Sequence, residues 1–245
     1  MNVVTRHCPR IAATLSVLMV LAVIATPVSA ANPNPGVVPP NAHFMGKSYG
    51  EWHAAWWQWA FSIPAEQSPF LDPTGANCTV GQSGHVWFLA GTFITTNQTG
   101  MILGEADRSC IVPAGTALLF PLINGEASSA ENNGTTVDEL TQAAADQIRD
   151  VTELDATIDG QPLAEPFSYR ATSPGFTWGP LPKDNILSMP EGTSTLAVAD
   201  GYMVLVAPLS VGTHTITFGG RVQISADLVF IQRISYTITV VPGHH

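Results

Sequence analysis

"VGTHTITFGG" at residues 211–220 and "RISYTITVV" at residues 233–241 decide the fold expected for this chain. In the first stretch His214, Ile216 and Phe218 alternate with threonines. Successive side chains of a β-strand face opposite sides, so this alternation predicts strands with one buried and one polar face.

Similar strand patterns extend back to residue 85. They are "HVWFLAGTF" (85–93), "SCIVPAGTALLFPLI" (109–123, strand, turn and strand), "LDATIDGQPL" (154–163), "SYRAT" (168–172), "STLAVA" (194–199) and "GYMVLVAPL" (201–209). Asp159-Gly160 is a hairpin-turn signal, and Asp200-Gly201 is interpreted as a second turn. The polar stretch "GEASSAENNG" (125–134) is expected to be a loop.

Two helices are expected in the N-terminal half. Ser48 and Glu51 form a capping-box pattern before "YGEWHAAWWQWAFSIP" (49–64), and Pro64 ends the run, so a helix is expected from residue 49 to 62 or 63. A second capping box at residues 136–139 begins an apolar stripe. The stripe consists of Val137, Leu140, Ala144, Ile148 and Val151.

The first helix holds four of the six tryptophans of the chain. With one residue every 100°, Trp52, Trp56 and Trp59 fall on one apolar stripe, which predicts that they pack against a sheet. Trp57 and His53 fall at the edge of this stripe, where they are expected to be partly exposed.

Together these patterns predict a mainly β protein. About nine or ten strands and two early amphipathic helices favour a single β-sandwich, jelly-roll-like or immunoglobulin-like in topology. The sandwich is expected over residues 47–242. The proline-rich residues 31–46 are expected to form an extended arm, and residues 243–245 a tail.

The N-terminus predicts export. Arg6 and Arg10 precede an apolar run, and Val28-Ser29-Ala30 fits a cleavage site, so residues 1–30 are interpreted as a signal peptide. The alternative, an uncleaved anchor, is disfavoured because a membrane span needs about 20 apolar residues. We therefore expect a secreted, periplasmic or cell-envelope protein without a membrane span after cleavage.

The cysteines and the charge agree with this expectation. Cys78 and Cys110 remain after cleavage and are predicted to form a disulfide, with a two-cysteine metal site as the alternative. The net charge of −10 gives no electrostatic reason to bind nucleic acid or an anionic membrane.

"YGEW…WWQWAFSIP", "GQSGHVWFLAGTF", "CIVPAGTALLFPLIN" and "ADGYMVLVAPLSVGTHTITFGG" resemble the signature blocks of uncharacterised exported hypothetical proteins of bacteria and archaea. The resemblance covers most of residues 46–220. It implies export and a single domain, and it transfers no catalytic residue because no activity is assigned to that group.

Catalytic signals are weak. Ser83 lies in "GQSGH", which departs from the nucleophile elbow because His85 replaces its last glycine and a strand follows. Carboxylate or histidine acid–base chemistry could use Glu51, Glu126, Asp200 or His53. The mature histidines form no metal-binding motif, so neither a metal nor a cofactor is expected.

Binding is the first hypothesis, and a catalytic role is left open. Trp57, His53 and Trp178 are the candidate ligand-binding residues, with Trp178 expected to be exposed in a Pro/Gly loop. The further aromatic candidates are Trp87, which is interpreted as core, Tyr169 and Tyr202. The sequence thus predicts an exported, non-catalytic β-sandwich that binds an extracellular or envelope ligand, with carbohydrate as a candidate. The alternatives are a secreted hydrolase acting on a polymer or ester, and a purely structural surface protein.

Overall fold

A computed structural model describes Met1, Asn34 and residues 36–243 of the chain. The described residues from Asn34 onward belong to one compact unit. Apart from Met1, the predicted signal peptide lies outside the described residues, as do His244 and His245 of the predicted tail.

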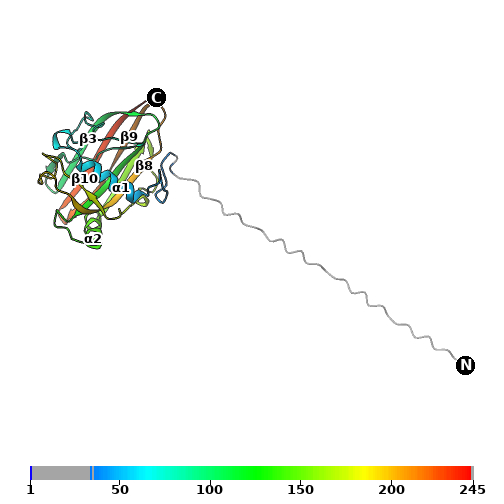
Figure 1. The fold of residues 1–245 in the computed structure, drawn as a ribbon. Helices are drawn as coiled ribbons and strands as arrows, with labels where there is room; N and C mark the ends of the chain where they lie inside the picture. The colour runs from blue at the N-terminus through cyan, green and yellow to red at the C-terminus, as the bar shows by residue number, and fades with distance from the viewer. Residues whose placement is uncertain (2–33, 35, 244–245) are drawn as a thin grey trace. The chain divides into compact units, whose positions relative to one another are not determined.

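The described part contains two α-helices and ten strands (Figure 1). The helices are α1 (Tyr49–Phe61) and α2 (Val137–Gln147), and two 3-10 turns are η1 (Ala65–Gln67) and η2 (Pro166–Tyr169). The strands are β1 (Val86–Phe88), β2 (Thr95–Gln98), β3 (Met101–Pro113), β4 (Ala117–Ser128), β5 (Val151–Ile158), β6 (Gln161–Pro162), β7 (Phe176–Trp178), β8 (Thr195–Val206), β9 (Gly212–Ser225) and β10 (Leu228–Val241). The predicted mainly β class is confirmed.

The strands form two sheets. One has four strands in the order β1-β4-β8-β7, and the other has six in the order β2-β3-β10-β9-β5-β6. Each sheet contains one parallel pair, β1 with β4 and β3 with β10, and the other pairs are antiparallel. The β3–β10 pair runs from Met101↔Val229 to Pro113↔Val241 and so joins strands far apart in the sequence.

The two sheets contact each other through apolar side chains. Phe120 of β4 stacks on Phe218 of β9 with ring centroids 4.6 Å apart. Nearly every residue of β4 and β8 is buried, so these strands are covered on both faces. Helix α1 packs against β7 and β8, while α2 packs against β4 and β8 through Leu140 and Ala144.

Helix α1 has the predicted capping box but not the predicted exposed edge. The Ser48 side chain accepts from the Glu51 backbone N–H, and Glu51 accepts from the Ser48 backbone N–H. Trp57 and His53 are 6% and 0% exposed, so the expected partial exposure of both is wrong. Trp52, at the centre of the predicted stripe, is only partly buried.

Helix α1 is covered on two sides. His53 lies 2.9 Å from the Ala171 carbonyl and 3.2 Å from Asn124 of β4, so its side of the helix faces the sheet. The loops that follow α1 cover the side that carries Trp56 and Trp59. Trp56 donates its Nε1–H to the Leu89 carbonyl at 3.1 Å, and Trp59 donates to the Val80 carbonyl at 3.0 Å. Chain segments 62–93 therefore cover a side of the helix that the sheet does not. A helical wheel describes an amphipathic helix with one covered face and cannot anticipate a second.

Other local predictions need correction. Helix α2 ends at Gln147, so Val151 begins β5, and Val137 is exposed. The predicted strand 168–172 begins inside the 3-10 turn η2 and is reduced to one isolated bridge, Arg170 with Tyr202. The expected loop 125–134 begins inside β4. Asp200-Gly201 lies within β8, where a Cβ on Gly201 would be 2.5 Å from the Asn124 Cα. The glycine therefore permits close strand packing and makes no turn.

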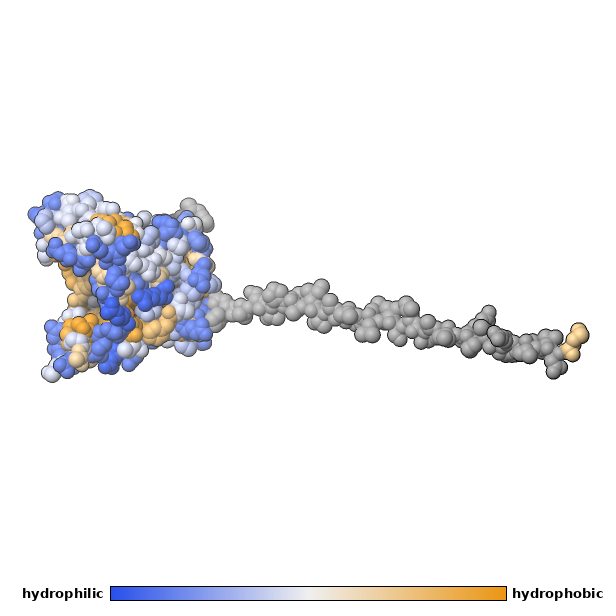
Figure 2. Space-filling model, turned by 90° about the horizontal axis from the view of Figure 1, so that it is seen from below, coloured by the Kyte–Doolittle hydropathy of each residue, from blue (hydrophilic) through white to orange (hydrophobic). Residues whose placement is uncertain are grey.

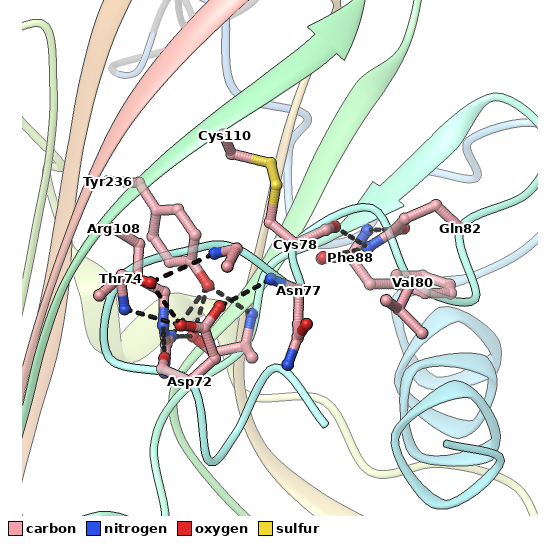
Figure 3. Close-up of a disulfide and its surroundings, with 12 residues drawn as sticks. Asp72, Thr74, Asn77, Cys78, Val80, Gln82, Phe88, Arg108, Cys110 and Tyr236 are labelled. Atoms are coloured by element: carbon pink, nitrogen blue, oxygen red, sulfur yellow. Dashed lines mark hydrogen bonds between the residues drawn. A yellow bond between two sulfur atoms is a disulfide. The ribbon is translucent and has the colours of Figure 1, made fainter. Parts of the chain in front are cut away.

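The hairpin and the disulfide follow the prediction. Asp159 and Gly160 have φ angles of 51° and 75° between β5 and β6, as a two-residue hairpin turn requires. Cys78 and Cys110 form a disulfide that joins the loop after α1 to β3 (Figure 3). Closing this loop stabilises the fold by about 3–4 kcal/mol in the chain-entropy treatment.

No helix among the described residues is long and apolar enough to cross a membrane.

Candidate functional site

A cavity of about 490 Å³ is lined by residues of both sheets and both α-helices. Five aromatic side chains line it: Trp56, Trp57, Phe70, Phe93 and Phe230. Its aliphatic lining comes from Ile123 of β4, Ile148 after α2, and Val222 and Ile224 of β9. A volume of this size and a mostly apolar lining are typical of small-molecule sites.

The rest of the lining is polar and uncharged. It consists of Gly91, Thr92, Thr95, Asn124, Gln147 and Gln232. No acidic, basic or histidine side chain lines the cavity among the described residues. A site without charges favours neutral ligands, because an ion would lose its hydration without a compensating partner.

His53 orients one of these amides. Its Nδ1 lies 2.9 Å from the Ala171 carbonyl, which can only accept, so Nδ1 carries the proton. Burial lowers the pKa of His53 to about 4, which keeps the ring neutral and leaves Nε2 as an acceptor. Asn124 Nδ2, 3.2 Å from Nε2, is therefore the donor. This contact fixes which way the Asn124 amide is turned.

Glu126 of β4 is a buried carboxyl beside Trp178 of β7. Its Oε1 accepts the Trp178 Nε1–H at 2.9 Å, while Oε2 receives no hydrogen bond from a described residue. Burial, and then the neighbouring Glu131, raise the pKa of Glu126 far above its usual range. The acid form fits this environment, since its proton can be donated to the Glu131 carboxylate. Trp178 is fully buried, so its expected exposure is wrong.

The other acid candidates are structural. Asp200 is 2% exposed and accepts from Arg170 Nε at 3.1 Å and Nη2 at 3.0 Å. Glu51 is exposed, and its hydrogen bonds to Ser48 lower its pKa. Glu51, His53 and Glu126 do not meet in the cavity, and none of the three lines it.

Ser210, His214 and Asp159 form a cluster with the residue types of a hydrolytic triad. His214 Nδ1 lies 2.7 Å from Asp159 Oδ2, and Nε2 lies 3.4 Å from Ser210 Oγ. However, Nε2 lies closer to the Ser210 carbonyl, at 2.9 Å, and that oxygen can only accept. Bonds to Asp159 and to this carbonyl raise the pKa of His214 and favour imidazolium. An imidazolium cannot act as the general base that a triad requires.

A second polar cluster lies beside the disulfide (Figure 3). Arg108 of β3 is 1% exposed and donates to the Asp72 carbonyl and the Ala90 carbonyl, both at 2.7 Å, and to Tyr236 Oη at 2.9 Å. Arg108 thus ties two loop segments to β3 and β10. It does not line the cavity, so its role is to hold the fold.

Sequence reasoning located only part of the cavity. Among the candidate ligand-binding residues, Trp57 lines the cavity, but as a buried ring and not an exposed one. His53 contacts Asn124 behind the lining, and Trp178 lies beside Glu126. Asn124 and Gln232 were not among the candidates. Gln232 stands on the inward face of β10 in a row of apolar residues, and that break in the alternation was the available signal.

Figure 2 shows a molecular surface hollowed between two lobes, with apolar residues gathered beside the hollow. Three large apolar side chains, Phe93, Ile94 and Ile224, are 38–54% exposed, and two of them, Phe93 and Ile224, line the cavity. Apolar residues at a cavity rim favour entry of an apolar ligand.

No family model, curated protein or solved structure matches the chain.

The raised pKa of Glu126 gives a pH-dependent prediction. The folded protein keeps the Glu126 proton above the ordinary carboxyl pKa of 4.5, while the unfolded chain loses it there. Stability from this group is therefore complete below that pH and is lost as the pH rises through the folded pKa. A glutamine side chain in place of Glu126 would keep an acceptor for Trp178 and donate to Glu131 without a proton to lose.

Glu126→Gln is expected to raise the free energy of unfolding by about 2 kcal/mol at pH 8 and to change it little at pH 4. Urea unfolding at the two pH values measures this difference. Glu153→Gln is the control, because that side chain is 70% exposed and should change stability equally at both. Equal stability of wild type and Glu126→Gln at pH 8 would contradict a protonated Glu126.

Proposed function

We propose that this protein is an exported, non-catalytic binding protein that holds a small apolar ligand in the cavity between its sheets. The observation that carries the proposal is the cavity of about 490 Å³, which is lined by five aromatic rings and by no charged group of the described residues. Aromatic and aliphatic walls of this kind gain free energy by taking apolar surface out of water.

The proposal extends to the fold and location. The Phe120–Phe218 stack supports one β-sandwich of jelly-roll-like or immunoglobulin-like topology. The Cys78–Cys110 disulfide supports an oxidising compartment, either secreted, periplasmic or in the cell envelope. A relation to the uncharacterised exported proteins that the sequence resembles belongs to the same proposal.

The hydrolase alternative has less support. General acid–base chemistry needs two titratable groups that converge on one cleft. His53, Glu126 and Asp200 are buried and held by structural hydrogen bonds, and none of the three lines the cavity. We therefore propose binding and no reaction.

Nile red, a neutral apolar dye, tests this proposal. We expect its fluorescence to rise on binding, with a dissociation constant in the micromolar range for one site. Phe93→Ala should weaken binding about fivefold, because it removes an aromatic wall worth about 1 kcal/mol.

Phe167→Ala is the matched control. Phe93 and Phe167 are 48% and 47% exposed, and each contacts one other ring, but only Phe93 lines the cavity. The control should leave dye affinity within about twofold of wild type. Absence of saturable dye binding, or equal weakening by both variants, would reject the cavity as the binding site.

A further inference from the structure

The cavity lining contains amide oxygens that receive no donor and one donor, Trp57 Nε1–H, that has no acceptor among the described residues. Gln232 donates Nε2–H to the Leu122 carbonyl at 2.9 Å, and Asn124 donates Nδ2–H to His53. Both acceptors fix the orientation of these amides, since a carbonyl and an unprotonated imidazole nitrogen require a donor. The remaining oxygens, Gln232 Oε1 and Asn124 Oδ1, receive no hydrogen bond from any described residue.

Of the two amides, Gln232 gives the stronger evidence for a hydrogen-bond donor on the ligand. It is only 8% exposed and lies on the inner face of β10, between apolar neighbours of the same face. Its Oε1 lies against Gly91, where an added Cβ would come within 2.6 Å of that oxygen. Both Gln232 and Gly91 line the cavity, and Gly91 leaves room for this carbonyl. Gln232 Oε1 is not among the fully enclosed side-chain atoms without a partner, so it is open to the cavity and within reach of a ligand. A ligand that covered this oxygen without donating to it would remove its water and cost free energy, whereas a ligand donor would replace that water.

We propose that the cavity binds an uncharged, mostly apolar ligand with a hydroxyl group that donates a hydrogen bond to Gln232 Oε1. Asn124 Oδ1 is a second acceptor for a ligand that carries two such groups. The absence of charged lining residues disfavours a carboxylate or an ammonium, whose hydration nothing in the described part of the cavity would replace. This inference rests on the proposed binding function and specifies the chemistry of its ligand.

The test compares 1-nonanol with 1-methoxyoctane. Both have the same number of heavy atoms and similar apolar surface, but only the alcohol donates a hydrogen bond. Displacement of Nile red should show the alcohol binding about tenfold more tightly than the ether. Nonanoate and nonylammonium, tested in the same way, should both bind more weakly than the alcohol.

Gln232→Met keeps the length of the side chain and removes its amide. It should reduce the alcohol-to-ether ratio to within about twofold while the ether still binds. Gln223→Met is the matched control: Gln223 lies on the adjacent strand β9, donates its amide to backbone carbonyls, and does not line the cavity. This control should keep the full ratio.

The outcomes separate the two proposals. Equal affinities of wild type for alcohol and ether overturn the hydroxyl inference and leave apolar binding intact. Tighter binding of nonylammonium or nonanoate than of nonanol also overturns it. If neither the dye, the alcohol nor the ether binds, the proposed binding function fails. The wild-type comparison stands even if Gln232→Met does not fold.

Discussion

Arg108→Met is expected to lower the free energy of unfolding by about 3 kcal/mol. The substitution removes three hydrogen bonds of 2.7–2.9 Å and leaves the Asp72 carbonyl without its donor, while the Ala90 carbonyl keeps the Tyr236 Oη–H at 3.2 Å. Each buried acceptor that loses its partner costs about 1–3 kcal/mol. The substitution also removes an unfavourable contribution, because the buried Arg108 guanidinium is desolvated and its Nη2 has no partner among the described residues. This gain offsets part of the loss.

Arg233→Met is the control for this prediction. Arg233 lies on β10 of the same sheet, is 65% exposed and meets Glu105 at 3.4 Å, so its loss should change stability by less than about 0.5 kcal/mol. Urea unfolding of both variants with the disulfide intact gives the comparison. If Arg108→Met is as stable as wild type, the desolvation of the cation outweighs its three hydrogen bonds.

Arg108 also shows what sequence patterns can and cannot give. The alternation of β3 places residue 108 on the buried face, but no local pattern reveals the carbonyls and the tyrosine that make an arginine acceptable there. Those partners come from residues 72, 90 and 236, which only the tertiary fold brings together. The two capping boxes, the β5–β6 hairpin turn and the disulfide were predictable, because each has a signal in the local sequence or in the cysteine content.

The cavity was less predictable for the same reason. Its lining comes from α1, α2, four strands (β2, β4, β9 and β10) and the loops around residues 70 and 91–93. The sequence identified only Trp57 as a functional candidate within it. The parallel pairing of β3 with β10 places Gln232 in the cavity lining. Strand periodicity shows which face of a strand is buried, but it does not show which distant strand pairs with it. The predicted exposure of Trp178 is wrong because Glu126, a residue distant in sequence, provides a buried acceptor for the Trp178 Nε1–H.

Trp56→Ala is expected to lower the free energy of unfolding by about 4 kcal/mol, as deletion of a fully buried aromatic ring does. Trp56 is 1% exposed, contacts the rings of Trp57 and Phe70 at 5.0 and 5.2 Å, and donates to the Leu89 carbonyl. The neighbouring rings are held in place by α1 and by the loop that follows it, so they are not expected to move into the space that the Trp56 side chain leaves.

Alanine variants of Trp52 and Trp57 distinguish the prediction of the helical wheel from that of the structure. The wheel places Trp52 at the centre of the apolar stripe and Trp57 at its edge, so it predicts a larger loss for Trp52→Ala. In the structure Trp57 is 6% exposed and packs on Trp56 and Phe61, while Trp52 is only partly buried.

We therefore expect Trp57→Ala to cost about 3 kcal/mol and Trp52→Ala about 1–2 kcal/mol. Urea unfolding of the three alanine variants orders them. A larger loss for Trp52→Ala than for Trp57→Ala would contradict the burial of Trp57 in the structure. The cavity would then lose one of its walls, because Trp57 lines it.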